Sequence, residues 1–326
     1  MKRALMLLLK AGVSIGLLAF FLSRVDLPSF LRALSTAQRS FLAVALLVYL
    51  CGQFLSSIRW TLLARAVGFE NRFKDFAQYF FIGMFFNLFA PSTVGGDVGR
   101  VFYLARDGVN RKESARAGLT TLAAISVLAD RAIGMAVLIW VGAAAVAAFP
   151  EFLLPPGLHY TTFAVALGFL LGFIFLPVLS SLFQKRNNRV VQKLHLALET
   201  YRHRWRALLQ AMILSLVVHS LQAWMHVLIG RALGVEIPLS YAFIIYPLVG
   251  TFSALPVSLN GIGLREGGYI FLLTRIGVSS EQAIAFGLLW IIVVALDSSI
   301  GGLLYVLKKR AAPRVAESEA KNYARK

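Results

Sequence analysis

The sequence predicts an all-α integral membrane protein with about six full transmembrane helices and two re-entrant helical hairpins, arranged in two inverted repeats. Three observations lead to this expectation. The 326 residues are 58% hydrophobic and only 15% charged, with a mean hydropathy of +0.73, which is far from the profile of a soluble domain. The apolar residues form long runs that are separated by basic segments. Landmarks in the first half of the chain also return in the second half.

Six apolar runs are long enough to cross a bilayer, for which about 20 residues are needed. The first run follows a basic start, but Lys10 interrupts it and no small-residue cleavage site follows it. We therefore expect a retained helix there and not a signal peptide. The runs cover residues 4–22, 41–63, 117–148, 160–183, 207–233 and 282–307.

Two further apolar segments are broken in the middle by proline and glycine. The first covers 76–106 around P-S-T-V-G-G-D-V-G-R at 91–100, and the second covers 240–275 around P-V-S-L-N-G-I-G at 256–263. Because proline and glycine interrupt helices, each segment is expected to form a pair of half-helices.

The basic residues orient the spans. The net charge is +18, and the Lys and Arg residues cluster between apolar runs, which the positive-inside rule explains without a nucleic acid. Placing the basic clusters inside predicts a multi-pass protein of the cytoplasmic (inner) membrane with both termini cytoplasmic. It also makes both broken segments re-entrant, from opposite faces. The arginines of the loop 23–40 do not fit this topology. The clusters lie at the N-terminus, at 59–74, 106–116 and 185–206, and from Lys308 onward.

The basic cluster at 185–206 ends in Y-R-H-R-W-R, directly before an apolar run. Mixed basic and aromatic residues at this position are typical of an anchor at the level of the lipid headgroups.

An internal repeat relates the two halves. Five landmarks recur in the same order at a nearly constant offset, close to half the chain length, and each half contains an odd number of crossings. The second half is therefore expected to be inserted upside down, an arrangement typical of secondary transporters. We expect repeats at 1–148 and 149–309, and a charged cytoplasmic tail at 310–326. The matching positions include 65–70 with 231–236, Pro91 with Pro256, Gly96 with Gly261, Arg100 with Arg265, and 130–134 with 297–301.

The tips of the two hairpins carry residues suited to binding an anion. A half-helix that begins inside the membrane presents free backbone N–H groups, and glycines let an anion approach them. Asp97 is expected to cap the second half-helix, and Arg100 adds a bidentate donor suited to phosphate. The predicted substrate-binding residues are Ser92, Gly95, Gly96, Asp97, Arg100, Asn260, Gly261, Gly263, Arg265 and Glu266.

Three more charges lie deep in predicted spans, namely Asp130, Arg131 and Asp297, and we expect them to gate or couple movement. Adjacent helix residues point about 100° apart, so Asp130 and Arg131 are expected to bond a hairpin tip or the substrate and not each other. Two alternatives stay open. The tip charges would form purely structural ion pairs, or Asp130 and Asp297 would carry protons.

Other chemistry is not indicated. His219 and His226 lie seven residues apart, but no third ligand accompanies them, so helix packing is preferred to a metal site. Cys51 is the only cysteine, and no nucleophile motif or Walker loop is present. We expect no cofactor, no metal and no nucleic-acid partner, and no motif indicates an oligomeric state.

Three motifs together resemble the family named for the transmembrane region of lysylphosphatidylglycerol synthase, which includes the membrane domain of the multiple peptide resistance factor. They are P-S-T-V-G-G-D-V-G-R, the D-R pair at 130–131, and P-V-S-L-N-G-I-G-L-R-E-G at 256–267, and the similarity covers about residues 40–305. The resemblance implies a flippase for an anionic lipid, either a phospholipid or a lipid linked to polyprenyl phosphate. Because the chain stops soon after Lys308, we expect no synthase domain and no enzymatic activity.

Two other functions remain as alternatives. A transporter of a small soluble anion would use the same tips. A membrane-embedded transferase acting on lipid phosphates would use Asp97 or Asp130 as its base.

Overall fold

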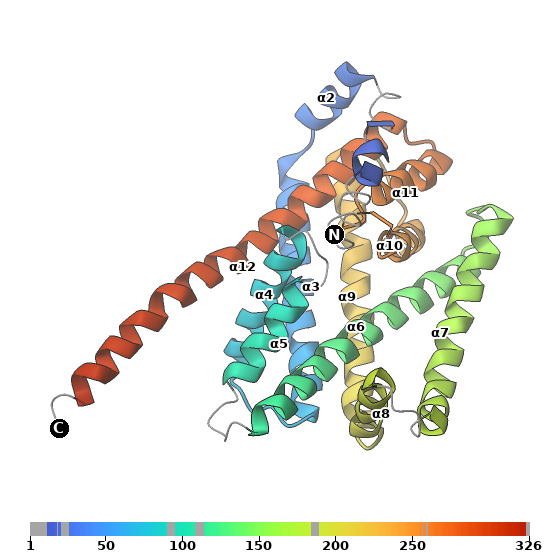
Figure 1. Cartoon of the computed structure of the whole chain (residues 1–326). Coiled ribbons are helices and arrows are strands. Elements are labelled where there is room, and N and C mark those ends of the chain that lie inside the picture. The colour runs from blue at the N-terminus through green and yellow to red at the C-terminus, as the bar shows by residue number, and fades with distance from the viewer. Residues whose placement is uncertain are drawn as a thin grey trace.

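The computed structural model describes residues 12–17, 19–20, 26–89, 95–107, 114–183, 189–255, 257–258 and 260–323. In these ranges the chain forms α-helices and one short 3-10 helix, and it contains no strand (Figure 1). The all-α prediction is confirmed.

Five helices are long and apolar enough to cross a membrane, which confirms a multi-pass membrane protein. They match five of the six expected runs. The sixth run, 4–22, lies mostly outside the described residues, although 12–17 and 19–20 are helical. The five helices are α3 (Arg39–Ala66), α6 (Ser114–Ala148), α7 (Pro156–Phe183), α9 (Trp205–Ala232) and α12 (Ser280–Tyr323).

Both broken segments consist of two shorter helices that pack on each other. The first contains α4 (Phe73–Phe89) and α5 (Gly95–Asp107). The second contains α10 (Leu239–Ser253) and α11 (Leu264–Leu273), followed by the 3-10 turn η1 (Thr274–Ile276). We call them the first and second hairpins. Residues 90–94, 256 and 259, at the two breaks, lie outside the described residues.

The centre of the fold is the antiparallel pair α3 and α9, which pack along their length (Figure 1). At one end the Gln38 N–H donates to the Ala232 carbonyl at 2.8 Å. At the other end the Tyr201 hydroxyl donates to the Leu63 carbonyl at 3.0 Å. These contacts fix the central pair at both ends.

The hairpins pack against the third helix of the opposite half. α4 packs on α12, and α10 packs on α6. Glycines allow both crossings, because a Cβ at Gly301 would overlap the Phe81 carbonyl and a Cβ at Gly142 would lie 2.8 Å from the Pro247 Cβ. Within each half, α5 packs on α6 and α11 packs on α12. Each helix–helix contact made by the first hairpin therefore has a corresponding contact made by the second hairpin.

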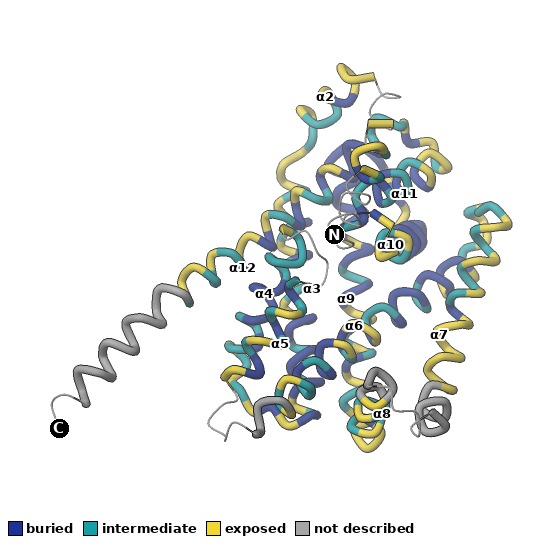
Figure 2. Tube along the Cα trace, in the orientation of Figure 1, coloured by how far each residue is buried: buried dark blue, intermediate teal, exposed yellow. Residues whose placement is uncertain are grey.

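α7 differs from the other long helices because most of it is exposed, whereas α3, α6 and α9 carry many buried residues (Figure 2). It contacts α6 and α8. The apolar side chains of α7 that the structure describes, as far as Phe175, are therefore available to lipid.

Two segments expected to be loops contain helices. α2 (Leu27–Ser35) lies in the loop 23–40, where the Asp26 carboxylate accepts the Ser29 N–H at 3.0 Å and caps the helix. α8 (Arg189–Arg202) lies in the basic segment 185–206. The apolar residues of α8 recur at helical spacing, so the basic composition hid an amphipathic helix there. The charged tail also begins as a continuation of α12, through Tyr323.

Candidate functional site

A buried carboxylate links two arginines in the half of the molecule that holds the first hairpin. Asp130 of α6 accepts from Arg59 Nε at 2.8 Å and from Arg100 Nη2 at 2.9 Å. Arg59 also donates from Nη1 to the Ser215 hydroxyl of α9, at 2.9 Å. All of these side chains are buried. The network therefore joins α3, α5, α6 and α9 around one carboxylate.

Arg59 does not lie where the pattern of basic residues predicts. It belongs to the basic cluster 59–74, which is expected to lie in a cytoplasmic loop, but the residue lies inside α3 and is only 8% exposed. The partner carboxylate Asp130 makes this burial possible, because a buried charge must be paired. The position of Arg59 within the apolar run 41–63 is the signal that could have found it.

Aromatic rings hold the Arg100 guanidinium from the other side. Its carbon lies 4.2 Å from the Trp60 ring centroid and 4.8 Å from the Phe80 ring centroid. The Trp60 indole N–H donates to the Ser126 hydroxyl at 3.2 Å, which fixes the ring. Arg100 Nε, however, is buried and has no hydrogen-bond partner among the described residues. Arg100 is thus held in place, while its Nε donor is not used by any described residue.

Asp97 and Arg131 form a second, more exposed ion pair beside this network. Arg131 donates from Nε and Nη2 to the Asp97 carboxylate, each at 3.0 Å. Asp97 also lies 3.6 Å from Arg100 Nη1. Asp130 and Arg131 therefore bond different residues of the first hairpin, as their neighbouring positions on one helix predict.

The expected capping role of Asp97 is wrong, because α5 begins at Gly95 and Asp97 lies inside its first turn. The side chain of Asn87, on α4, bonds the start of α5 instead, because its Oδ1 accepts the Gly96 N–H at 2.9 Å. The contact is close, because a Cβ at Gly96 would overlap the carbonyl of Gly83. A glycine is therefore required where α5 starts against α4.

The tips of the two hairpins touch. Asn260 of the second hairpin donates from Nδ2 to the carbonyls of Leu88 at 3.0 Å and Asn87 at 3.3 Å. These carbonyls belong to the last turn of α4, where helix carbonyls lack intrahelical partners. Asn260 adopts a positive φ of 49°, which asparagine tolerates better than most residues. The chain thus brings together two tips that are about 170 residues apart in sequence.

At the second hairpin the charges pair with each other. Arg265 donates to Glu266 Oε1 from Nη2 at 2.7 Å and from Nε at 3.1 Å. Glu266 Oε2 accepts the Gly263 N–H at 2.6 Å, and the Arg265 guanidinium lies 4.5 Å from the Trp290 ring centroid. Arg265 and Glu266 therefore form an ion pair with each other, which is the geometry expected if the charges at the tip have a structural role.

Asp297 is the residue that the sequence comparison of the two halves matches with Asp130, but its surroundings differ. It is fully buried in α12, and neither of its carboxylate oxygens has a hydrogen-bond partner among the described residues. Trp290 lies two turns earlier on the same helix, and its indole N–H also lacks a described partner. The buried hydroxyls of Ser253 and Ser258, next to the second tip, likewise have no hydrogen-bond partner among the described residues. Several buried polar groups in α12 and next to the second tip thus lack a hydrogen-bond partner in the part of the chain that the structure describes.

The family can now be assigned. The family model described as the lysylphosphatidylglycerol synthase TM region matches residues 7–300, which include both hairpins, Asp130 and Asp297. The chain belongs to this family. Membership relates this membrane protein to the handling of lipids. No curated protein matches the chain.

In this lysylphosphatidylglycerol synthase TM-region protein, most of the predicted site residues gather at the two tips. The first tip carries Gly95, Gly96, Asp97 and Arg100, with Asp130 and Arg131 bonded to it, and the second carries Asn260, Gly261, Gly263, Arg265 and Glu266. Ser92 lies outside the described residues. Sequence reasoning missed Arg59 and Trp60, whose contacts bridge separate helices.

The two histidines of α9 serve helix packing. His219 Nδ1 lies 2.9 Å from the Tyr246 hydroxyl, and its Nε2 lies 2.9 Å from the Gly134 carbonyl. His226 Nδ1 lies 2.8 Å from the Gln222 carbonyl, and its Nε2 lies 3.0 Å from the Tyr269 hydroxyl. His219 therefore uses both nitrogens to bond other helices, whereas His226 does so through Nε2 alone, because Gln222 belongs to α9 itself. The described residues contain no group of metal-ligating side chains.

Proposed function

We propose that this protein moves an anionic, phosphate-bearing lipid between the leaflets of the cytoplasmic membrane. The headgroup would bind near the midplane, where the two hairpin tips meet. The observation that carries the proposal is Arg100, a buried arginine at the first tip whose Nε donor has no hydrogen-bond partner among the described residues. Free arginine donors bind phosphate oxygens well, because the guanidinium is planar and always charged.

The balance of charge at the first tip also supports an anionic ligand. Arg59, Arg100 and Arg131 carry three positive charges, whereas Asp97 and Asp130 carry two negative charges. An excess positive charge inside a membrane is costly, by about 2.5–3.5 kcal/mol or more at the centre of the bilayer. A bound phosphate would supply the missing negative charge.

The packing supports an inverted repeat with re-entrant hairpins. α4 packs on α12 as α10 packs on α6, and the two hairpins lie toward opposite ends of the α3–α9 pair (Figure 1). The end of α5 lies beside the end of the α12 span, since Lys308 Nζ is 3.6 Å from the Asp107 carboxylate. Because this end is rich in basic residues, we place it and both termini in the cytoplasm. The first hairpin would then enter and leave by the cytoplasmic face.

A lipid is preferred to a soluble anion because of the family and because of the surface near the second tip. A crevice between α6, α7 and α10 is lined mainly by apolar groups and reaches Phe252, at the end of α10. Ile139 and Val165 line its other walls. Apolar walls favour contact with hydrocarbon over contact with a hydrated anion. The headgroup would lie at the tips while the hydrocarbon chain stays on the lipid side.

The remaining charges would control access. We assign gating to the ion pairs Asp97–Arg131 and Arg265–Glu266, which would open when a headgroup binds. We assign coupling to Asp297, because an unpaired buried carboxylate gains most from taking up a proton or a cation. The activity would be translocation without covalent change of the lipid.

Reconstituted vesicles test the proposal. Wild-type protein should move a fluorescent phosphatidylglycerol between leaflets faster than protein-free vesicles do, and Arg100→Gln should abolish the difference. Arg106→Gln is the matched control, since Arg106 lies on the same helix but is exposed at its end. Equal rates for wild type and Arg100→Gln would contradict the assigned site.

Two further measurements separate the alternatives. Release of radioactive phosphate from loaded vesicles, without lipid movement, would favour a transporter of a soluble anion. A new lipid species, detected by mass spectrometry after incubation with the pure protein, would favour a transferase.

A further inference from the structure

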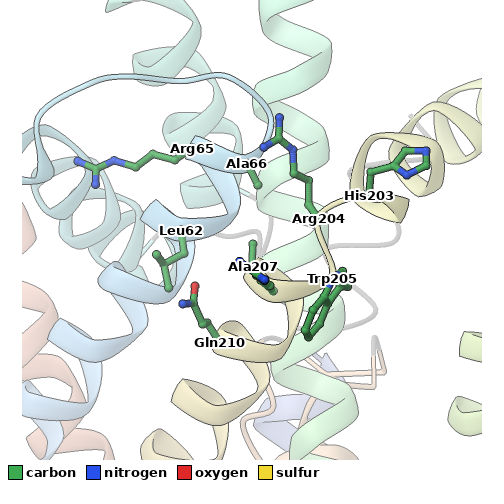
Figure 3. Close-up of a pocket in the computed structure, with 9 residues that line it drawn as sticks. Leu62, Arg65, Ala66, His203, Arg204, Trp205, Ala207 and Gln210 are labelled. Carbon is green, nitrogen blue, oxygen red and sulfur yellow. The ribbon is translucent and has the colours of Figure 1, made fainter.

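A separate basic pocket lies at the surface, where α3 ends and α9 begins. It has a volume of about 570 Å³, and it is lined from α3 by Leu62, Arg65 and Ala66 and from the α8–α9 corner by residues 203–207 and Gln210. In Figure 3 Leu62 lies near Ala207 and Gln210, and the longer side chains of Arg65, Arg204 and His203 extend above them. The pocket is therefore lined by residues of two helices, α3 and α9, and of the corner that precedes α9.

The lining of this pocket is cationic and contains no carboxylate. Arg65, Arg204 and Arg206 all contribute, and His203 and Gln210 add further hydrogen-bonding groups. None of the three arginines forms an ion pair with a carboxylate among the described residues, whereas nearby Arg202 pairs with Glu199 at 3.5 Å. Three unpaired guanidinium groups around one hollow are suited to an anion with several oxygens.

The walls of the pocket are held in place by specific contacts. Tyr201 is buried, and its hydroxyl donates to the Leu63 carbonyl of α3 at 3.0 Å. The Arg204 N–H donates to the Tyr201 carbonyl at 2.9 Å, which turns the chain from α8 into α9. The corner that carries Arg204 and Trp205 is therefore fixed to the end of α3 before any ligand binds.

An apolar stripe leads from this pocket along α9. Trp205, Leu209, Ile213 and Leu216 are spaced at helical intervals on one face, and each side chain is about half exposed (60%, 48%, 54% and 50%). α9 is one of the helices that cross the membrane, so this face is available to hydrocarbon chains. Trp205 belongs to both features, since it also lines the pocket. An aromatic residue at this level is typical of the boundary between headgroups and hydrocarbon.

We propose that this pocket binds the phosphate of an anionic phospholipid from the adjacent leaflet, with an acyl chain lying along the exposed stripe of α9. The arginines supply the charge that the phosphate needs, and the stripe explains why the occupant is a lipid and not a free anion. This second lipid site is independent of the proposed transport site, because it shares none of its residues.

Native mass spectrometry of the full chain in detergent tests the site, with dioleoyl phosphatidylglycerol and dioleoyl phosphatidylcholine as probes. We expect retained phosphatidylglycerol, and a triple variant Arg65→Gln/Arg204→Gln/Arg206→Gln should lower its affinity by about fivefold for each arginine removed. The triple variant Arg72→Gln/Arg106→Gln/Arg202→Gln is the control, because it removes the same charge from exposed arginines outside the pocket.

Several outcomes would overturn the proposal. They are equal affinity in the two triple variants, equal affinity of the wild type for the two lipids, or competition by glycerol phosphate as strong as competition by the lipid. If the pocket variant does not fold, Arg204→Gln alone must still lower the affinity about fivefold. The transport site is distinguished by Arg100→Gln, which should remove a different bound lipid and leave this one in place.

Discussion

The two repeat-related carboxylates should respond in opposite ways to the same substitution. Asp130 is bonded to Arg59 and Arg100, whereas Asp297 has no described partner. Replacing Asp130 by asparagine removes the carboxylate that Arg59 pairs with, and it leaves Arg100 only the Asp97 carboxylate, at 3.6 Å. Replacing Asp297 by asparagine removes a buried charge that no described residue compensates.

The expected magnitude follows from the contacts. Asp130 accepts two charge-assisted hydrogen bonds, each worth about 1.5–3 kcal/mol. Removing one partner of a buried ion pair typically costs about 3–5 kcal/mol, which agrees with the sum. We therefore expect Asp130→Asn to lower the free energy of unfolding by about 3–5 kcal/mol, and Asp297→Asn to leave it unchanged or to raise it.

Unfolding in mixed micelles, titrated with sodium dodecyl sulfate and followed by tryptophan fluorescence, measures both values. The double variant Arg59→Met/Asp130→Asn should lose less free energy of unfolding than the sum of the two single losses, because the two residues interact directly. Equal losses for Asp130→Asn and Asp297→Asn, or a loss below about 1 kcal/mol for Asp130→Asn, would refute the assigned pairing.

The close contacts of the hairpins give further predictions. Gly96→Ala should destabilise the protein by about 1–3 kcal/mol, because the new Cβ overlaps the Gly83 carbonyl. A Cβ at Gly99 meets no atom within 4 Å, so Gly99→Ala should be neutral or stabilising. The same unfolding titration compares the two variants. Asn260→Ala should cost about 1–3 kcal/mol and slow lipid movement in vesicles, because it removes both tip-to-tip hydrogen bonds and places alanine at a positive φ. Asn260→Gly should cost less than Asn260→Ala, and the opposite order would show that the backbone conformation there is unimportant.

Much of the helical framework could be predicted from the sequence. Span length depends on bilayer thickness, and five runs of apolar residues became five long helices at nearly the expected residues. Proline and glycine marked both breaks correctly, because they disrupt the helix locally. α2 and α8 were missed, since short helices with mixed composition leave no long apolar run.

The partners in the site could be predicted only in part. The divergence of Asp130 and Arg131 followed from helix geometry alone. The pairing of Asp130 with Arg59, 71 residues away, depends on how α3 and α6 pack, and no local pattern encodes that contact. The matching positions of Arg100 and Arg265 in the two halves do not extend to their contacts. The structure gives them different carboxylate partners, because Glu266 follows Arg265 directly and has no counterpart after Arg100.

Crosslinking tests the central claim, that an anionic headgroup binds between the hairpin tips. The reconstituted full chain would be irradiated with a phosphatidylglycerol that carries a photoreactive diazirine in its headgroup, and the modified peptides would be identified by mass spectrometry. The account predicts adducts within 95–100 and 257–265 that an excess of unlabelled phosphatidylglycerol suppresses and that Arg100→Gln reduces. Adducts confined to the membrane surface, with both tips unmodified, would contradict it.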